Sequence, residues 1–297
     1  MAFNTPILLI TFNRPERVRV VLTEIRKQQP AKLYVFQDGA RKDRPDDIEK
    51  CKAVRDAVSD LVDWPCELHT NYQKNNLGCG PGPFTAISWF FENEEYGIIM
   101  EDDIYPHPLF FRYCDELLAK YADETRIGAV MGHNFYRKYS TCNSYYYTFD
   151  TEGTLGWATW RRVWGNVRFD VEVNAADFDL ALKKNYGFPK PYRERETNHF
   201  VRVLDCDRHD RWDYQLEYCL KLNGYINIKP NSCLTSHEGD DSDATHEGYT
   251  NPNYKMDVHE ERLLPIKHPK KIKIARFEKR AMYVKSLKIY IKGLLRK

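Results

Sequence analysis

Short apolar runs alternate with longer amphipathic stretches through the first third of the chain. The runs at residues 6–12, 32–37, 66–71 and 97–100 have the length of strands. Between them, residues 16–28, 45–62 and 84–93 are predicted helices; in the first, apolar residues recur with helical spacing at Val18, Val21, Leu22 and Ile25. This alternation predicts an α/β fold with a mostly parallel central sheet and right-handed crossovers.

The pattern is less regular after residue 100. We expect helices at residues 110–121 and 214–222, and strands at residues 126–131, 145–148 and 225–229. From Phe277 to Leu295, apolar residues follow helical steps and basic residues fill much of the rest, which predicts a basic amphipathic C-terminal helix. These changes divide the chain into residues 1–115, 116–262 and 263–297.

Three of the predicted strands in the first third end in polar side chains. Arg14 follows the first strand, Asp38 the second, and an acidic cluster the strand at residues 97–100. The carboxyl ends of parallel strands share one edge of the sheet, where ligands of open α/β sheets bind. A cation, a single acid and an acidic cluster on that edge suit a nucleoside diphosphate: Arg14 would meet phosphate or base, and Asp38 would accept hydrogen bonds from base or ribose. Taken alone, Arg14 is equally a surface residue at a helix start, and Asp38 a turn former before Gly39.

The acidic cluster is Glu101, Asp102 and Asp103, and it follows an apolar strand without a break. Three adjacent like charges repel one another, so they need a compensating partner, and a divalent cation is the natural one. The simpler interpretation is a solvated acidic turn. In the cation hypothesis, Asp103 is the principal ligand, with Asp102 and Glu101 in support.

A loop rich in glycine and proline, residues 76–83, precedes the third predicted helix. Its spacing matches neither GxGxxG nor GxxxxGK[ST], which excludes a Rossmann dinucleotide site and a P-loop. We expect it to shape the wall of the binding pocket instead.

Composition narrows the class of protein further. Of 297 residues, 42% are hydrophobic, as in a globular protein, and the net charge of +2 argues against a general nucleic-acid binder. Residues 267–297 contain twelve of the 45 Lys and Arg but one of the 43 Asp and Glu, so the body is acidic and the tail basic. Eight cysteines without paired spacing, no signal peptide and no apolar run long enough to span a membrane predict free thiols in a reducing cytosol.

Several of these segments together resemble a known family. FNRP at residues 12–15, QDG at 37–39, NLG at 76–78, and EDD at 101–103 followed by Pro106 and a Phe pair look like a GT-A glycosyltransferase. Within that fold they are most similar to the N-acetylglucosaminyltransferase I type and its bacterial nucleotide-diphospho-sugar transferase relatives. The resemblance covers about the first 115 residues, and islands of it extend to about residue 250. PGPF after NLG departs from the pattern, because a basic or hydroxyl residue would be expected there against phosphate.

The resemblance implies an inverting, metal-dependent hexosyltransferase that uses Mn²⁺ or Mg²⁺ and a nucleotide-diphosphate sugar, with UDP-sugar the expected donor. Residues 1–115 would bind the donor, through Phe12, Arg14, Asp38 and Asp102, and residues 116–262 would bind the acceptor. It also implies that the acid of a Trp-Asp segment, here Asp213 after Trp212, is the catalytic base. An ordinary aspartate has a pKa of about 3.9 and is ionised at neutral pH. Without the resemblance, Asp213 is equally an N-terminal helix cap.

Two further segments of the second half leave alternatives open. Trp157, Trp160 and Trp164 have helical spacing, so they either pack in the core or, as in the resembled family, form a floor between donor and acceptor. Residues 236–248 are a polar loop, either a surface loop or a lid in which Thr245 touches the diphosphate and His246 the metal. His237 competes with them for that role.

The basic tail predicts binding to an anionic membrane surface, which would suit a lipid-linked glycan acceptor in surface polysaccharide synthesis. The protein would then be cytoplasmic and peripheral to the inner face of the membrane. A helix docked on the acidic body, or a partner-binding helix, is the alternative. Two rival functions remain: a sugar nucleotidyltransferase, which would need a Gly-rich basic loop after the first strand, and a catalytically inactive glycan-binding scaffold.

Overall fold

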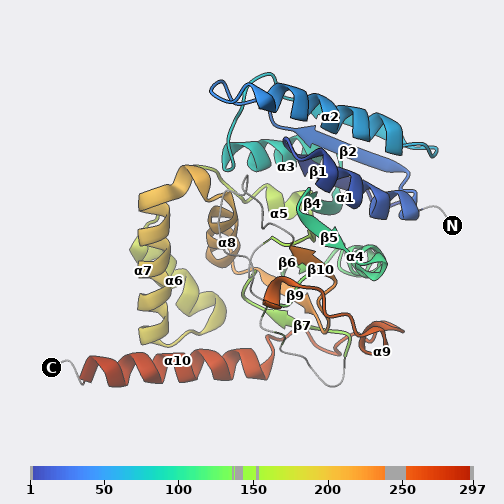
Figure 1. The fold of residues 1–297 in the computed structure, drawn as a ribbon. Coiled ribbons are helices and arrows are strands. Elements are labelled where there is room, and N and C mark those ends of the chain that lie inside the picture. The colour runs from blue at the N-terminus through green and yellow to red at the C-terminus, as the bar shows by residue number, and fades with distance from the viewer. Residues whose placement is uncertain (1–2, 136, 138–142, 152–153, 238–251, 295–297) are drawn as a thin grey trace.

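A computed structural model describes residues 3–135, 137, 143–151, 154–237 and 252–294 of the chain (Figure 1). Its strands are β1 (Ile7–Thr11), β2 (Lys32–Gln37), β3 (Glu67–Tyr72), β4 (Tyr96–Glu101), β5 (Ile104–Pro106), β6 (Ile127–Met131), β7 (Tyr145–Thr148), β8 (Trp157–Trp160), β9 (Ile226–Pro230) and β10 (Thr235–His237). Its α-helices are α1 (Pro15–Gln28), α2 (Asp46–Leu61), α3 (Pro81–Asn93), α4 (Pro108–Lys120), α5 (Arg161–Trp164), α6 (Ala175–Tyr186), α7 (Lys190–Asp207), α8 (Trp212–Leu222), α9 (Glu260–Leu263) and α10 (Arg276–Leu294). Two 3₁₀ turns, η1 (Arg208–Asp210) and η2 (Pro252–Tyr254), complete the described elements.

One sheet of eight strands runs through the molecule in the order β3-β2-β1-β4-β8-β6-β9-β7. The pairs β3-β2, β2-β1, β1-β4 and β6-β9 are parallel, whereas β8 and β7 are antiparallel to their neighbours. The prediction of an α/β fold with a mostly parallel sheet is confirmed. A small antiparallel pair of β5 and β10 lies beside the main sheet and places His237 opposite Ile104.

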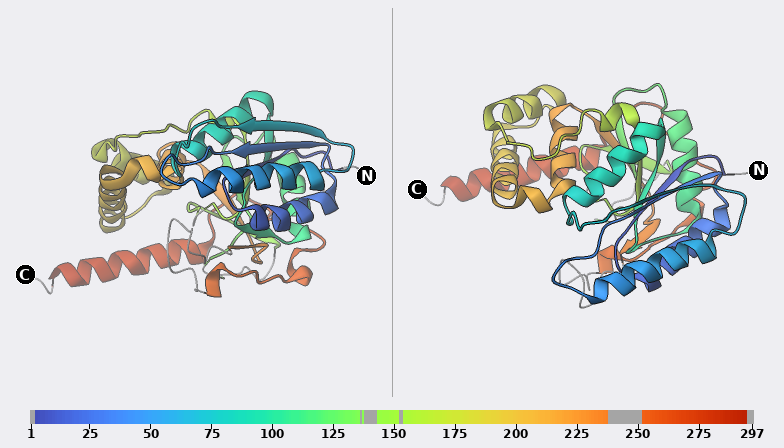
Figure 2. Two further views of the ribbon diagram at one scale, coloured as in Figure 1. Left: turned by 45° about the horizontal axis from the view of Figure 1, so that its top comes forward. Right: turned by 90° about the horizontal axis from the view of Figure 1, so that it is seen from above.

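The chain changes direction across the sheet at β1. From β1 it winds outward through β2 and β3, then returns to the other side of β1 as β4. The carboxyl ends of β1 and β4 therefore form a topological switch point, the usual ligand site of an open α/β sheet. The apolar run Ile7–Ile10 of β1 is buried on both faces, because α1 and α2 cover one face and α3 the other (Figure 2).

Helices α6, α7 and α8 pack together beside the sheet (Figure 1). The sequence analysis did not predict α6 or α7. Cap signals for α6 were present, since the Asn174 side chain accepts hydrogen bonds from the backbone of Ala176 and Asp177, and Gly187 ends the helix with a φ of 67°. Residue 115 lies inside α4, and strands from before and after it belong to the same sheet. The division of the chain at residue 115 into a donor half and an acceptor half therefore stays a prediction about function.

The tryptophan segment is neither a single helix nor an exposed floor. Trp157 and Trp160 belong to strand β8, and Trp164 ends the short helix α5. All three are buried, and the ring of Trp157 lies 6.4 Å from that of Trp212. The three tryptophans therefore pack in the core, which was the alternative to a floor between donor and acceptor.

Helix α10 is formed, but its apolar and basic residues are intermixed around the helix axis, so the predicted amphipathic pattern is not supported. Among the side chains of α10 that the structure describes, Glu278, Met282 and Ser286 are buried, and the helix lies against α7. No helix in the described ranges has both the length and the apolar composition needed to cross a bilayer. The seven cysteines with described positions are all free thiols.

Gly97 shows how tightly the strand that carries the acidic cluster is packed. A Cβ at this position would lie 2.3 Å from Cζ of Phe90 and 2.8 Å from the carbonyl oxygen of Pro6, and Phe90 is fully buried. We predict that Gly97→Ala lowers the free energy of unfolding by about 1–3 kcal/mol, because the core is overpacked. Gly165→Ala is the control, since its added Cβ would only touch the carbonyl oxygen of Arg161 at 3.5 Å. Equal unfolding midpoints in urea for the two variants would contradict this packing.

Candidate active site

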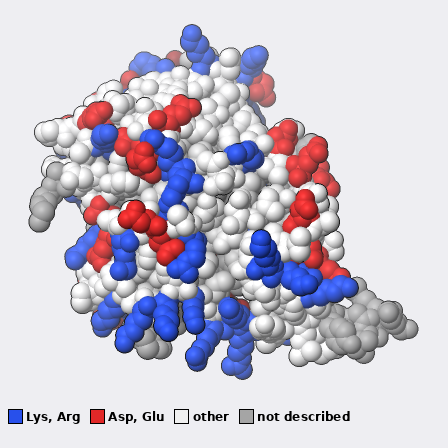
Figure 3. Space-filling view, turned by 180° about the vertical axis from the view of Figure 1, so that it is seen from behind, with Lys and Arg blue, Asp and Glu red and all other residues white. Residues whose placement is uncertain are grey.

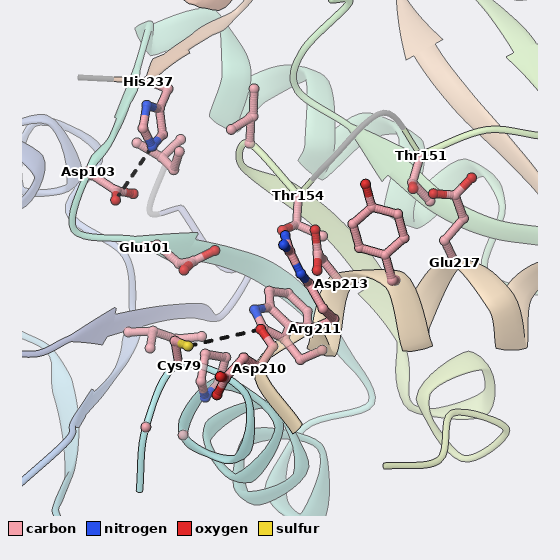
Figure 4. Close-up of a pocket in the computed structure, with 18 of the residues that line it drawn as sticks. Cys79, Glu101, Asp103, Thr151, Thr154, Asp210, Arg211, Asp213, Glu217 and His237 are labelled. Carbon is pink, nitrogen blue, oxygen red and sulfur yellow. Dashed lines mark hydrogen bonds and ion pairs between the residues drawn. The ribbon is translucent and has the colours of Figure 1, made fainter. Parts of the chain in front are cut away.

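A cavity of about 1330 Å³ opens at the carboxyl ends of β1, β2 and β4. One side is lined by residues that follow these strands, including Phe12, Arg14 and Asp103, and by the 76–83 loop. The other side is formed by Asp150, Thr151, Thr154 and Leu155 and by helices α7 and α8. Figure 4 shows Asp103 and His237 at one end of this view, Thr151 and Glu217 at the other, and Asp213 between them. The cavity therefore joins both halves of the chain.

Arg14 binds the acidic cluster. Its guanidinium donates to Oδ1 of Asp102 and, over 3.1 Å, to Oδ2 of Asp103. Asp102 is 1% exposed and also accepts a hydrogen bond from the backbone N–H of Phe12 at 3.4 Å. Arg14 therefore supplies, within the fold, a compensating charge of the kind that the sequence pattern assigned to a metal ion. Its side chain also lines the cavity, and its contact with phosphate or base stays a prediction.

Burial and neighbouring charges together set the pKa values of these acids. Burial raises the pKa of Asp102 to about 6, although Arg14 opposes the shift. Burial also opposes ionisation of Asp103, yet its contacts with His237 and Arg14 lower its pKa to about 2. The pKa of Glu101 is raised well above its ordinary value, by burial and by the charges of Asp103 and Asp102. Asp103 is thus the acid of the cluster that stays ionised most readily.

A protein-only metal cage does not form here. Among the residues that the structure describes, no group of three or more His, Cys, Asp and Glu side chains could hold a metal ion. Asp103 Oδ2 faces Arg14 at 3.1 Å and His237 Nε2 at 3.6 Å. Magnesium-type cations need only one or two protein carboxylates when substrate phosphates supply the other oxygens. The described residues fit a metal ion only as a joint site with a diphosphate.

Asp38 binds backbone and amide groups of its own chain. Its Oδ1 accepts hydrogen bonds from the backbone N–H groups of Gly39 and Leu77, both at 2.8 Å. Its Oδ2 accepts from the backbone N–H of Gly78 at 3.0 Å and from the amide of Asn76 at 2.9 Å. A carboxylate has about four acceptor positions, and these four bonds use them. Asp38 therefore fixes the 76–78 segment against the end of β2 and leaves little capacity for a base or ribose.

Phe12 and Arg41 form a wall of the cavity beside Asp38. The Arg41 guanidinium lies 5.3 Å from the centre of the Phe12 ring. Buried Asp47 accepts from Nε of Arg41 and from the amide of Asn13, both at 2.7 Å. The hydrogen bond from Arg41 is the main reason that the pKa of Asp47 is lowered to about 2. Asp47 stays ionised and holds Arg41 in place, so this wall offers an aromatic ring and a fixed cation.

Asp213 stands in the first turn of α8, across the cavity from the acidic cluster. Its charge contributes to the raised pKa of Glu101, so the two carboxyl groups are within electrostatic reach. Trp212 before it is buried in the core and fixes the start of α8. The Asp213 side chain lines the cavity. The structure therefore brings together the acidic cluster and the acid named as catalytic base.

Gly80 allows this approach of the two halves. A Cβ at this position would come within 1.6 Å of the carbonyl oxygen of His209, in the turn η1 just before α8. Any side chain here would push the start of α3 away from η1, and with it the 76–83 loop from Asp213. The glycine is therefore required by close backbone contact rather than by phosphate binding.

His237, named as a competitor in the polar loop, lies in the cavity beside Asp103 on strand β10. Thr245 and His246 fall outside the described residues. Several charged cavity residues were not identified from the sequence, among them Arg41, Arg211, Glu217 and Lys221. Asp213, Glu217 and Lys221 are spaced by four residues, and this charged stripe on an otherwise apolar helix was the available signal.

Comparisons with known proteins give no family assignment. No model of a known protein family matches the chain, and no curated protein sequence does. Solved structures with some similarity include HddC from Yersinia pseudotuberculosis, with 8% sequence identity and a TM-score of 0.30 over 43% of this chain and 57% of that one. This chain thus spans less than two thirds of HddC.

Two other solved structures are similar over longer shares. A UDP-glucose pyrophosphorylase complexed with UDP-glucose has 9% identity and a TM-score of 0.36 over 76% of this chain and 90% of that one. The inositol-1-phosphate CTP transferase from T. maritima has 12% identity and a TM-score of 0.31 over 55% of this chain and 73% of that one. None of the three names identifies a glycosyltransferase, and similarity at this level carries neither fold nor activity across.

The Arg14 contact predicts a large effect on stability. Arg14→Gln should lower the free energy of unfolding by about 3 kcal/mol or more, because Asp102 stays buried without its countercharge. A second change, Asp102→Asn, should restore part of the loss. Urea denaturation followed by circular dichroism measures both.

Arg19→Gln on the same helix is the matched control. Its 3.1 Å pair with Asp60 is exposed to solvent, and such pairs contribute about 0–1 kcal/mol. Similar losses for Arg14→Gln and Arg19→Gln would contradict the role of Arg14.

Proposed function

We propose that the protein is an inverting glycosyltransferase. It moves a sugar from a nucleotide-diphosphate donor, UDP-sugar in our proposal, to a hydroxyl of a glycan or lipid-linked acceptor in surface polysaccharide synthesis. The observation that carries the proposal is the position of Asp213, which faces the Arg14–acid cluster across one cavity at the switch point of the sheet.

The donor would lie along the carboxyl ends of β1, β2 and β4. Its base would occupy the wall made by Phe12 and Arg41, in place of the contact with Asp38 expected from the sequence. Its diphosphate would lie near Asp103, with Arg211 as a further cation that lines the cavity. A divalent cation, Mn²⁺ or Mg²⁺, when held by Asp103 together with phosphate oxygens, supplies positive charge against the leaving diphosphate.

The transfer step follows from the placement of Asp213. The acceptor hydroxyl oxygen attacks the anomeric carbon and forms the new glycosidic bond. The bond from that carbon to the diphosphate oxygen breaks, and its electron pair leaves with the diphosphate. Asp213 takes the hydroxyl proton as general base. Because one displacement occurs, the configuration at the anomeric carbon inverts.

A sugar nucleotidyltransferase, named as a rival in the sequence analysis, is the second candidate, and a UDP-glucose pyrophosphorylase and a CTP transferase are among the solved structures with some similarity. Such an enzyme would need a Gly-rich basic loop after the first strand to bind a nucleoside triphosphate. Here β1 ends at Thr11 and α1 begins at Pro15, so only Phe12, Asn13 and Arg14 intervene. This short connection favours the glycosyltransferase.

The two candidates consume different substrates, and a catalytically inactive glycan-binding scaffold consumes neither. The purified protein is incubated with UDP-sugars and Mn²⁺, and in parallel with UTP and sugar 1-phosphates. UDP release in the first reaction supports the proposal. Pyrophosphate release in the second, without UDP release in the first, would replace it with the nucleotidyltransferase. The scaffold would show neither reaction.

Asp213→Asn tests the catalytic base. We predict that sugar transfer falls about 10²–10⁴-fold, because general-base catalysis is lost, while UDP affinity measured by calorimetry stays unchanged. Asp205→Asn, at an exposed position of α7, is the control and should keep full activity. Full activity of Asp213→Asn would remove Asp213 from the mechanism.

Attachment of α10 to an anionic membrane surface is a further part of the proposal, although the apolar and basic residues of α10 do not form separate faces. One of its sides packs on α7, whereas Tyr283, Val284, Leu287 and Ile291 are exposed near Lys279, Arg280 and Lys288. Figure 3 shows Lys and Arg side chains gathered along the lower edge of the molecule. Apolar side chains can enter the lipid interface. Each Lys or Arg close to an anionic membrane adds about 1 kcal/mol to the free energy of binding.

We predict that the protein sediments with phosphatidylglycerol vesicles but not with phosphatidylcholine vesicles. Replacing Leu287 and Ile291 together by Glu should reduce this binding about tenfold or more, because apolar contact is lost and charge is repelled. Leu180→Glu, at an exposed position of α6, is the control. Equal binding to both vesicle types would contradict attachment through α10.

A further inference from the structure

The cavity continues past Asp213 into a deep lobe between helices α7 and α8. Helix α7 contributes Tyr192, Glu196 and His199, which are spaced as one face of a helix. Helix α8 contributes the stripe of Asp213, Glu217 and Lys221 at four-residue intervals. Two packed helices normally bury apolar side chains between them. Here Phe200 of α7 does pack against Tyr218 of α8, but charged side chains line the lobe beside this contact. Burying charge is costly unless it is paired or used.

The charges of the lobe converge on one lysine. Lys221 Nζ lies 2.6 Å from Glu217 Oε1 and 3.2 Å from Glu196 Oε2, and the lysine side chain is 3% exposed. Asp150 shares a hydrogen bond with Glu217 from the other side, and burial is the main reason that the pKa of Glu217 is raised to about 8. Three carboxyl groups thus surround one ammonium. Oxygen acceptors outnumber donors, so the lobe favours a ligand that donates hydrogen bonds.

Aromatic rings lie beside these acceptors. The His199 and Tyr214 rings are 5.7 Å apart, and Tyr192 and Phe200 also line the lobe. Flat apolar faces next to carboxylates suit a sugar ring, which has C–H faces and hydroxyl edges. An anionic sugar would be disfavoured, because the carboxylates of Asp150 and Glu196 outnumber the single ammonium of Lys221, and Glu217 adds no positive charge.

The stripe on α8 connects the lobe to the donor end. Glu217 is one helical turn from Asp213, a separation of about 5–6 Å between Cβ atoms. Figure 4 shows Glu217 beside Thr151 on the side of Asp213 away from Glu101 and Asp103. A sugar unit in the lobe would therefore present a hydroxyl toward Asp213.

We propose that this lobe binds the acceptor as a neutral, hydroxyl-rich sugar unit, and that Glu217 and Asp150 accept hydrogen bonds from its hydroxyls. The inference rests on the proposed function, because it assigns the acceptor side of the same cavity. It adds the chemical class of the acceptor, which excludes phosphorylated and carboxylated sugars from this lobe.

Saturation-transfer NMR on the full chain tests the inference with free sugars as probes. Glucose, galactose and N-acetylglucosamine form the neutral set, and glucuronic acid and glucose 6-phosphate form the anionic set. We expect signal from at least one neutral sugar and none from the anionic pair. Binding of only the anionic sugars, or of no sugar, would overturn the inference.

Two variants test whether the sugar binds in the lobe. Glu217→Gln should weaken neutral-sugar binding at least tenfold, and Asp150→Asn is a second variant that leaves the Lys221–Glu217 pair in place. Glu260→Gln, at an exposed position of α9, is the control. Unchanged sugar binding in both lobe variants would contradict the assignment.

UDP calorimetry on the same samples separates this inference from the proposed function. We expect UDP affinity to be the same in the wild-type protein and in both lobe variants. Wild-type protein that binds UDP but no sugar overturns the acceptor lobe alone. Wild-type protein that binds a neutral sugar but neither binds nor turns over a UDP-sugar overturns the proposed function, while the lobe remains a sugar site.

Discussion

Arg14 holds the ends of β1 and β4 together by binding Asp102 and Asp103, which would otherwise repel each other at the edge of the sheet. Two like charges about 4 Å apart cost about 4 kcal/mol at an effective dielectric constant of 20. The arginine neutralises that repulsion within the fold, before any ligand is present. As a result Asp103 stays ionised beside the cavity, whereas Asp102 is fully covered and serves the fold.

The site is built where the two halves of the chain meet. The proposed donor side comes from strand ends that the parallel sheet gathers at its switch point, and Asp213 comes from α8 on the opposite side. The backbone contact at Gly80 sets how closely the two sides approach. The cavity has the ionised Asp103 at one end, Asp213 as the candidate base in the middle, and a polar lobe beyond it. It is large enough for two substrates to lie in line. That arrangement is what a group transfer between them requires.

The strand and helix order of the first third was predictable, because β1, α1, β2 and α2 each bury a regular apolar stripe. Helix α7 escaped prediction because its face toward the cavity is polar. The positions of Arg14, Asp38 and the acidic cluster at strand ends were also predictable from alternation alone. Their partners were not: that Arg14 reaches Asp102 across 88 residues, and that Asp38 binds the 76–78 segment, depends on how the strands are ordered in the sheet. Thr245 and His246 lie outside the described residues and stay predictions.

The central claim is that a nucleoside diphosphate binds at the switch point, with its phosphates beside Asp103 and its base against Phe12 and Arg41. A crystal structure of the protein with UDP and Mn²⁺ tests it most directly. The account predicts electron density for the diphosphate between Asp103 and Arg211, and for the base at the Phe12–Arg41 wall. Nucleotide density elsewhere on the molecule, with this cavity empty, would contradict it.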